Sequence, residues 1–368
     1  MGRRSLTLSL CGDVMLGRGV DQILPHPGDP VLREPCVTDA RDYVRLAEAA
    51  NGPIPRPVGF SWPWGDALEV LEEAAPDLRV VNLETSVTRS DDFALGKAVH
   101  YRMNPANLPA LAAARPDACV LANNHVLDFG RRGLAETLDA LAAAGLRAPG
   151  AGRDEEEAWR PEALDVAGGG RVLVFSCGTA SSGIPASWAA TRDRAGVAFV
   201  AERPEEGVAE IIGRVRQVKR PGDVAIVSLH WGSNWGYDVP LARRRFAQML
   251  VDGGADVVHG HSSHHPRPFE VYRGRLILYG CGDLIDDYEG ITGYEEYRDD
   301  LRLLYLVSLD ARSGELDGMR MVPLRARRMR LHRADSEDAE WLRGALGRAC
   351  RDFGSEVGLE PDGSLALR

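Results

Sequence analysis

Short apolar runs rich in Val, Leu and Ile alternate along the chain with segments of Ala, Leu, Arg and Glu that have a helical period. This alternation is typical of a β-sheet covered by helices, because buried strands are short and apolar whereas covering helices carry one apolar face. The pattern predicts strands at residues 6–11, 78–83, 118–122, 171–177, 223–230, 256–259 and 275–280. It predicts helices at residues 64–75, 105–114, 131–144, 204–218 and 240–252, with Asn104 as the N-cap of the second. The expected fold class is therefore α/β.

One early stretch and the last part of the chain depart from this alternation. The Pro- and Gly-rich stretch 22–60 has little periodicity, so we expect a long loop over the rim of the sheet. Two runs near 303–309 and 320–324 predict an antiparallel edge, and residues 335–351 predict a helix before a loose tail. On this basis the chain divides into a large domain over residues 1–325 and a C-terminal helix and tail over 326–368.

The charge balance and the cysteines limit the class of protein. The chain carries 54 acidic side chains against 44 Lys and Arg, a net charge of −10, which repels a phosphate backbone and argues against nucleic acid as a partner. The six cysteines lie far apart without a C-x-x-C spacing, as expected of free thiols. No run reaches the roughly 20 apolar residues that span a bilayer, and the start lacks a secretory cleavage site. We therefore expect a cytoplasmic protein that contacts no membrane.

Polar side chains gather where the predicted strands end. They are Asp13, Asn82, Glu84, Asn123, Asn124, His125, His230, His259, His261, His264 and His265. In an open α/β sheet the ligand crevice lies beyond the carboxyl ends of the strands, so we expect these side chains to converge. Their oxygen and imidazole donors suit a borderline divalent ion such as Mn²⁺, Zn²⁺ or Fe²⁺. A Cys-Gly-Asp tripeptide closes a strand at residues 11–13 and again at 281–283.

Five ordered motifs give these positions a family context. They are Gly12-Asp13-Val14-Met15-Leu16-Gly17-Arg18, Asn82-Leu83-Glu84, Asn123-Asn124-His125 with Asp128 and Gly130, His230-Trp231-Gly232, and Gly260-His261-Ser262-Ser263-His264 followed by Glu270-Val271-Tyr272. Over about residues 5–310 the chain resembles the CapA (PgsA) family linked to poly-γ-glutamate capsule synthesis. That family is similar to calcineurin-like metallophosphatases. The resemblance therefore implies a metallophosphatase-like two-sheet sandwich flanked by helices (αββα), with a site for two metal ions.

The resemblance also implies roles for individual residues. Asp13 would bind one ion, and Glu84 would stand at the bridging position. Asn124 and His230 would serve the second ion, and His125 would be an acid near the leaving group.

Two features of the chain depart from the metallophosphatase pattern. Met15 stands where metallophosphatases carry a histidine, and a thioether is a poor ligand for a borderline ion, so one of the two sites is expected to be weak or empty. From the histidine cluster we expect His261 and His264 as ligands, with His259 and His265 in reserve. The expected ligands of one divalent ion are thus Asp13, Glu84, Asn124, His230, His261 and His264.

Two reactions are open to this set of residues. A bound divalent ion would lower the pKa of a water to about 7 and favour hydrolysis of a phosphoester or a γ-glutamyl amide. Without a metal, crowded carboxylates and imidazoles supply both an acid and a base, which suits cofactor-independent epimerisation of a peptide Cα. The chain resembles the soluble CapA-like epimerases of lasso-peptide biosynthesis, so we place a peptide-modifying enzyme first and a metal-dependent hydrolase second. A non-catalytic binding module would leave the ionisable groups unexplained. The expected catalytic residues are Asp13, Glu84, His125, His230 and His264.

Aromatic and basic residues beside the motifs predict the substrate contacts. Trp231 and Trp235 follow His230 in a Gly-rich segment, where their rings would line a rim suited to an apolar or aromatic peptide side chain. Arg18 follows Asp13 by five residues, and its guanidinium fork would hold a carboxylate. We therefore expect a peptide substrate, presented by a partner protein or bound alone.

Overall fold

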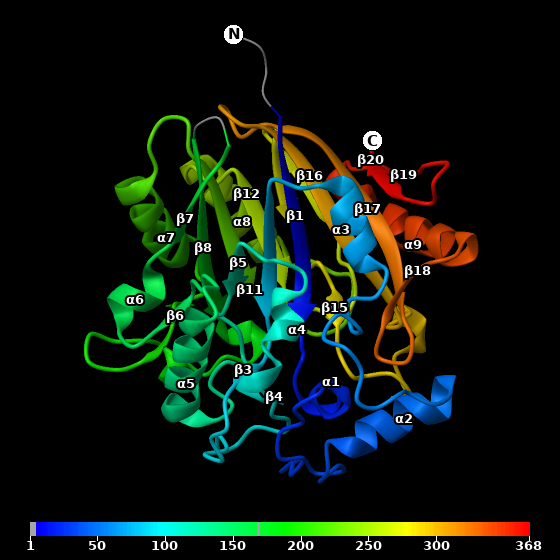
Figure 1. Ribbon diagram of the computed structural model, residues 1–368. Coiled ribbons are helices and arrows are strands. Elements are labelled where there is room, and N and C mark those ends of the chain that lie inside the picture. Colours follow the sequence, from blue (N-terminus) through cyan, green and yellow to red (C-terminus); the bar gives the residue numbers. More distant parts are fainter. Residues whose placement is uncertain (1–4, 168–169) are drawn as a thin grey trace.

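Two large β-sheets lie face to face in the computed structural model, which describes residues 5–167 and 170–368 (Figure 1). Within these residues the first sheet has the order β19-β20-β17-β16-β1-β2-β5, with β15 beside β1 and β18 beside β17. Its strands are β1 (Ser5–Val14), β2 (Leu78–Leu83), β5 (Ala118–Val120), β15 (Asp283–Ile285), β16 (Leu301–Asp310), β17 (Leu316–Ala326), β18 (Leu331–Arg333), β19 (Val357–Leu359) and β20 (Leu365–Leu367). The expectation that no secretory leader is present rests partly on residues 1–4, which lie outside the described residues.

The second sheet has the order β10-β8-β11-β12-β14-β13, with β7 beside β8. Its strands are β7 (Glu162–Asp165), β8 (Arg171–Thr179), β10 (Phe199–Val200), β11 (Val224–His230), β12 (Val257–His261), β13 (Phe269–Tyr272) and β14 (Arg275–Leu278). Two short ribbons pair β3 (Ser86–Val87) with β4 (Arg102–Met103), and β6 (Ala151–Gly152) with β9 (Gly196–Val197). The strands β8, β11 and β12 run parallel, as do β1, β2 and β5 in the first sheet.

Alternating side chains of the two sheets build the core between them. In β1 every second residue, Leu6, Leu8 and Leu10, packs in one cluster with Val172 and Val174 of β8. The intervening residues point outward, toward the helices, because successive side chains of a strand face opposite sides. The apolar runs of the sequence are therefore continuous because both faces of each sheet are buried.

Helices flank the two sheets, and several of them cover the outer faces. They are α1 (Arg18–Ile23), α2 (Arg41–Asn51), α3 (Ala67–Ala74), α4 (Pro109–Ala112), α5 (Gly130–Ala143), α6 (Glu155–Trp159), α7 (Pro204–Val218), α8 (Leu241–Gly253) and α9 (Ser336–Ala349). The apolar faces of α3, α4 and α5 join β2 and β5 in one core cluster, and those of α7 and α8 join β8, β11 and β12 in another. This layering confirms the predicted αββα sandwich (Figure 1).

The structure corrects two expectations about the less periodic segments. The stretch 22–60 is not wholly a loop, because it contains α2, whose residues Tyr43, Val44 and Ala47 are buried on one side. The expected loose tail is instead ordered as β19 and β20, and β20 pairs with β17. The proposed boundary at residue 325 falls inside β17. None of the helices in the described parts of the chain has the length and the apolar run that crossing a membrane requires.

Candidate functional site

Three buried side chains from both sheets meet at the carboxyl ends of their strands. Asp13 is the penultimate residue of β1 in the first sheet, while His230 and His261 end β11 and β12 in the second. The parallel register of β11 and β12 sets His230 directly opposite His261, and their Nδ1 atoms lie 2.8 Å apart. One ligand atom from each of the three residues lies within 4.8 Å of the others. We call these three residues the Asp/His cluster.

Glu84 adds a second carboxylate beside the Asp/His cluster. Its side chain shares a hydrogen bond with Asp13, and its Oε1 lies 3.7 Å from Nε2 of His230 and 3.8 Å from Nε2 of His125. Burial raises the pKa of Asp13 to about 7, and burial together with Asp13 raises the pKa of Glu84 well above its usual range. Two carboxylates buried side by side require either a shared proton or a cation.

The donor set of this site fits one divalent ion. Burial lowers the pKa of both His230 and His261 well below the usual value, so both imidazoles are neutral at neutral pH and each keeps one nitrogen lone pair. Asn124 brings an amide oxygen to 2.9 Å from Nε2 of His230. A carboxylate pair, two imidazoles and an amide oxygen suit Mn²⁺, Zn²⁺ or Fe²⁺. The structure thus brings together the residues expected from the motifs, except for His264.

His264 lies beside the Asp/His cluster in an ion pair of its own. Its Nδ1 is 3.0 Å from Oδ2 of Asp283, and its Nε2 is 2.9 Å from Nδ2 of Asn234. Burial opposes protonation, yet the Asp283 carboxylate outweighs it and raises the pKa of His264. Both ring nitrogens are therefore engaged outside the Asp/His cluster.

The two reserve histidines also lie outside the Asp/His cluster. His259 stands behind His261, where the hydroxyl of Ser228 bridges the two rings at 3.1 Å and 2.8 Å. His265 stacks on Tyr297, with ring centroids 4.6 Å apart. Of His259, His261, His264 and His265, only His261 belongs to the Asp/His cluster.

A second arrangement holds the imidazole of His125. Its Nδ1 lies 2.7 Å from Oδ2 of Asp128, and the ring of Tyr101 stacks on it at 3.8 Å. The ammonium of Lys97 donates to Asp128 and to the backbone oxygen of Asn124. Burial, opposed by Asp128 and aided by Lys97, lowers the pKa of His125 to about 4. The ring is therefore neutral at neutral pH, with Nε2 turned toward Glu84.

Buried amides set the spacing of these groups. Asn82 donates from Nδ2 to Oδ1 of Asp13 at 2.7 Å, and Asn123 donates from Nδ2 to Oδ1 of Asn82 at 3.1 Å. Asn123 also accepts from the backbone N–H of His125 at 3.1 Å. This chain of bonds ties the ends of β1, β2 and β5 together, so the carboxylates and His125 hold fixed relative positions.

The structure places Arg18 inside the protein. The side chain is buried, and its guanidinium pairs with Asp287 at 2.6 Å and with Glu34 at 3.0 Å. Its Cζ also lies 3.6 Å above the ring of Tyr43. The fork expected to hold a substrate carboxylate is therefore already occupied by two carboxylates of the chain, which corrects that expectation.

The two tryptophans expected at the rim have different positions. Trp231 is 2% exposed and packs in the core against Phe246, so its expected place at the rim is wrong. Trp235 is partly exposed, stacks on Tyr294 at 4.0 Å, and lies 5.2 Å from the ring of His264. Trp235 is therefore the one of the pair that adjoins the site from outside.

Two residues beside the site, Asp283 and Lys97, were not predicted as site residues from the sequence. Asp283 pairs with Asp13 in the register of β15 and β1, and the repeated Cys-Gly-Asp tripeptide was the signal for it. Lys97 comes from the segment between β3 and β4, where no periodicity or motif marks it.

The sequence of the chain is similar to those of several known proteins. A profile described as bacterial capsule synthesis protein PGA_cap matches residues 7–288. The chain is 55% identical over 363 residues to a Mycobacterium tuberculosis protein named probable polyglutamine synthesis accessory protein, covering 98% of this chain and 96% of that protein. It is 26% identical over 306 residues to the PGA biosynthesis protein CapA of Bacillus subtilis, covering 82% of this chain and 67% of that protein. Among solved structures, a novel phosphatase from Mycoplasma pneumoniae has a TM-score of 0.48 and 12% identity, covering 88% of this chain and 94% of that one.

Proposed function

Because the chain belongs to the family of bacterial capsule synthesis proteins described as PGA_cap, we propose that it is a metal-dependent hydrolase of a γ-glutamyl-type amide bond. The observation that carries this proposal is the buried Asp/His cluster with a second carboxylate beside it. The names of the relatives, which refer to polyglutamine synthesis and PGA biosynthesis, favour a poly-amino-acid chain as the substrate. They also favour a role beside other proteins of that synthesis.

The residues of the site divide the work of hydrolysis. Asp13, His230 and His261, with Glu84 and Asn124, would hold a divalent ion, which supplies an activated water and polarises the scissile carbonyl. His125 is neutral at neutral pH, so its Nε2 can accept a proton and return it to the leaving nitrogen. Asp128 holds the ring from the other side at Nδ1 and stabilises its charged form. The amide chain from Asn82 keeps Asp13 in place.

Rings beside His264 offer a contact for the substrate chain. Trp235 and Tyr294 stack at the surface, and Tyr294 is 38% exposed. A flat aromatic surface suits the methylene groups of an extended glutamyl chain, because it buries apolar area without requiring a charge. Of the three substrate contacts predicted from the sequence, Arg18, Trp231 and Trp235, we therefore propose Trp235 alone.

A second reaction, epimerisation at a peptide Cα, is favoured by one specific observation. Glu84 has a raised pKa and His125 a lowered one, and 3.8 Å separates their facing atoms. Two neighbouring groups whose pKa values are shifted in opposite directions supply one acid and one base at the same pH. The sequence analysis predicted a lasso-type peptide as the substrate, and that prediction applies to epimerisation, not to hydrolysis.

The two reactions are separated by one experiment with a γ-linked glutamyl oligomer in D₂O. Hydrolysis predicts new amine ends, loss of activity with a chelator, and recovery with Mn²⁺. Epimerisation predicts deuterium at one Cα, unaffected by the chelator. We expect the first result, with activity reduced on the order of 10²-fold in His125→Asn, which removes the group that transfers the proton. His332→Ala, which changes a histidine that lies beside Asp66, serves as the control. Chelator-resistant deuterium uptake would replace the hydrolase proposal with the epimerase, and neither product would exclude both.

A further inference from the structure

A basic turn joins β17 to β18 in the first sheet. Residues 325–333 contain five arginines and no acidic residue, the highest density of arginine in a chain whose net charge is −10. β17 runs antiparallel to β16, which runs antiparallel to β1, so β17 ends at the same edge of the sheet as Asp13. Figure 1 shows the turn at that end of the molecule. The basic turn therefore lies on the edge that carries the candidate site.

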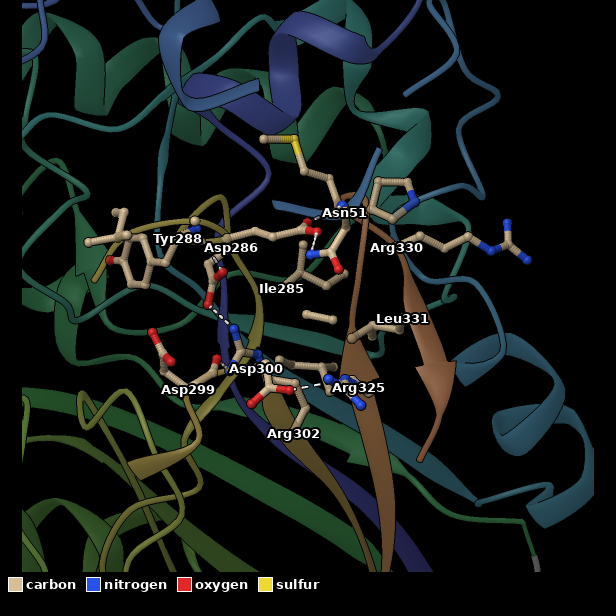
Figure 2. A pocket seen from close by; sticks show the side chains of 17 residues that line it. Asn51, Ile285, Asp286, Tyr288, Asp299, Asp300, Arg302, Arg325, Arg330 and Leu331 are labelled. Carbon is tan, nitrogen blue, oxygen red and sulfur yellow. Dashed lines mark hydrogen bonds and ion pairs between the residues drawn. The ribbon is translucent and has the colours of Figure 1, made fainter. Parts of the chain in front are cut away.

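Three of the five arginines have acidic partners. The pairs are Arg325 with Asp300 at 3.0 Å, Arg330 with Asp66 at 3.7 Å, and Arg333 with Glu73 at 2.7 Å between nitrogen and oxygen. Figure 2 shows the first of these pairs at the base of the turn. The positive charge of these three side chains is thus compensated within the protein.

The other two arginines, Arg327 and Arg328, are unpaired. Their side chains form no hydrogen bond or ion pair with any residue that the structure describes, and only their backbone groups are bonded. Arg327 is exposed, Arg328 is half-buried, and both line one surface hollow of about 250 Å³. His332 lines the same hollow, but burial lowers its pKa, so the ring carries no charge at neutral pH. Two uncompensated positive charges therefore face one hollow.

The carboxylates of this hollow are already engaged. Asp338 is buried and accepts from Arg298 at 2.6 Å and from Arg325 at 3.2 Å. Asp335 caps α9 by accepting from the backbone N–H of Asp338 at 2.9 Å. Four arginines face these two carboxylates across the hollow, so it keeps an excess of positive charge.

The turn has a backbone conformation that its residues do not favour. Arg328 and Met329 have φ values of 56° and 50°, in the left-handed region where Asn and Gly are the usual residues of a two-residue hairpin turn. Glu289 stabilises the turn by accepting from the N–H groups of both residues, at 2.7 Å and 2.9 Å. The indole of Trp62 donates to the backbone oxygen of Arg328 at 3.1 Å. These bonds fix the place at which the two unpaired arginines leave the backbone.

We propose that Arg327 and Arg328 bind a polycarboxylate chain, namely the part of the glutamyl substrate that lies outside the reaction centre. The inference rests on the proposed function for the identity of that chain. A γ-linked glutamyl chain carries one free carboxylate per residue, and a guanidinium binds a carboxylate through two parallel hydrogen bonds. A protein with a net charge of −10 repels such a polymer unless local positive charge holds it.

The separation between the turn and the candidate site sets the length of chain that this binding requires. Two strand spacings, about 10 Å, separate β17 from β1, and the turn projects beyond the strand ends. An extended chain covers at most about 3.5 Å per residue, so on the order of five residues connect the two places. A decamer reaches both places, whereas a trimer reaches one of them.

Fluorescence anisotropy of a labelled γ-linked glutamate decamer tests the proposal. Every protein in the test carries His125→Asn, so that binding is read without turnover. Arg327→Gln/Arg328→Gln should weaken decamer binding roughly tenfold in dilute salt, because two charge-assisted contacts are lost. Added salt should weaken binding to the protein with both arginines far more than binding to this variant.

The matched control removes the same charge at the opposite edge of the second sheet. Arg216 and Arg220 are exposed, and they lie at the end of α7 and just before β11 begins. Arg216→Gln/Arg220→Gln should leave the affinity for the decamer unchanged. An unlabelled trimer should compete equally weakly in all of these proteins.

A second variant avoids the left-handed pair of the turn. Arg327→Glu reverses a charge at an exposed position and should abolish decamer binding, while circular dichroism reports that the protein is folded. The proposal is overturned if the decamer does not bind, if neither folded variant weakens it, or if the control pair weakens it equally. Equally tight binding of a single-stranded oligonucleotide with the same number of charges would also overturn it.

This result is distinguishable from that of the hydrolase experiment. Hydrolysis of the oligomer together with unchanged decamer binding in both turn variants would remove the turn site and keep the hydrolase. Decamer binding that depends on Arg327 and Arg328, without hydrolysis when His125 is present, would keep the turn site and remove the hydrolase.

Discussion

Lys97 and Asp128 have opposite effects on the charge of His125. Lys97 is partly buried, pairs with Asp128, and lies 3.3 Å from Nδ1 of His125. Its positive charge disfavours a second positive charge on the imidazole, whereas Asp128 favours it. The protonation of His125 therefore depends on a residue from a segment without any recognisable motif.

Substitution of Lys97 should raise the pKa of His125. In Lys97→Met one of the groups that lower this pKa is lost, so the value should rise from about 4, which NMR titration of the imidazole Cε1–H signal measures. Lys219→Met is the matched control, because Lys219 also pairs with a buried aspartate, Asp256, but in another part of the fold. An unchanged His125 titration in Lys97→Met would show that Lys97 does not act on the ring.

At the scale of elements, the close approach of β1 and β15 positions two carboxylates. The register pairs Asp13 with Asp283, and the backbone N–H of Asp13 donates to the oxygen of Gly282 at 3.2 Å. A Cβ added to Gly12 would lie 1.8 Å from that same oxygen. The glycines of the repeated tripeptide thus allow the two strand ends to come together.

Gly12→Ala should therefore destabilise the protein by about 3 kcal/mol, since the backbone of β15 cannot withdraw without breaking the pairing. Urea unfolding measures the change. Gly213→Ala in α7 is the control: an added Cβ there meets open space, and alanine favours a helix by about 0.5–1 kcal/mol over glycine. Equal midpoints for the two variants would contradict the role given to Gly12.

The sequence predicted elements where local periodicity and burial coincide. The strand expected at 78–83 and the helix expected at 204–218 have the bounds observed for β2 and α7. The helix α2 was missed because Pro- and Gly-rich residues surround it, and its apolar residues are few. The strands β19 and β20 were missed because their pairing with β17 is a long-range contact that no local pattern records.

At the scale of the whole molecule, the sandwich assembles the site from both sheets. The strand-end rule predicted that Asp13, Glu84, His230 and His261 converge, and they do, because the carboxyl ends of β1, β2, β11 and β12 lie together. The rule could not predict which of His259, His261, His264 and His265 reaches the site. It also could not predict that Arg18 forms an ion pair with Asp287. Those outcomes depend on side-chain partners that no local pattern records: Asp287 lies 269 residues after Arg18, and Asp283 lies 19 residues after His264.

The central claim is that one divalent ion binds where Asp13 of the first sheet meets His230 and His261 of the second. The most direct test is calorimetric titration of chelator-treated protein with Mn²⁺, with elemental analysis of the product. We predict one ion per chain, lost in Asp13→Asn and in His261→Ala and retained in His332→Ala, with all three variants folded. Absence of binding in the unchanged protein, or an ion that stays in both cluster variants, would contradict the account.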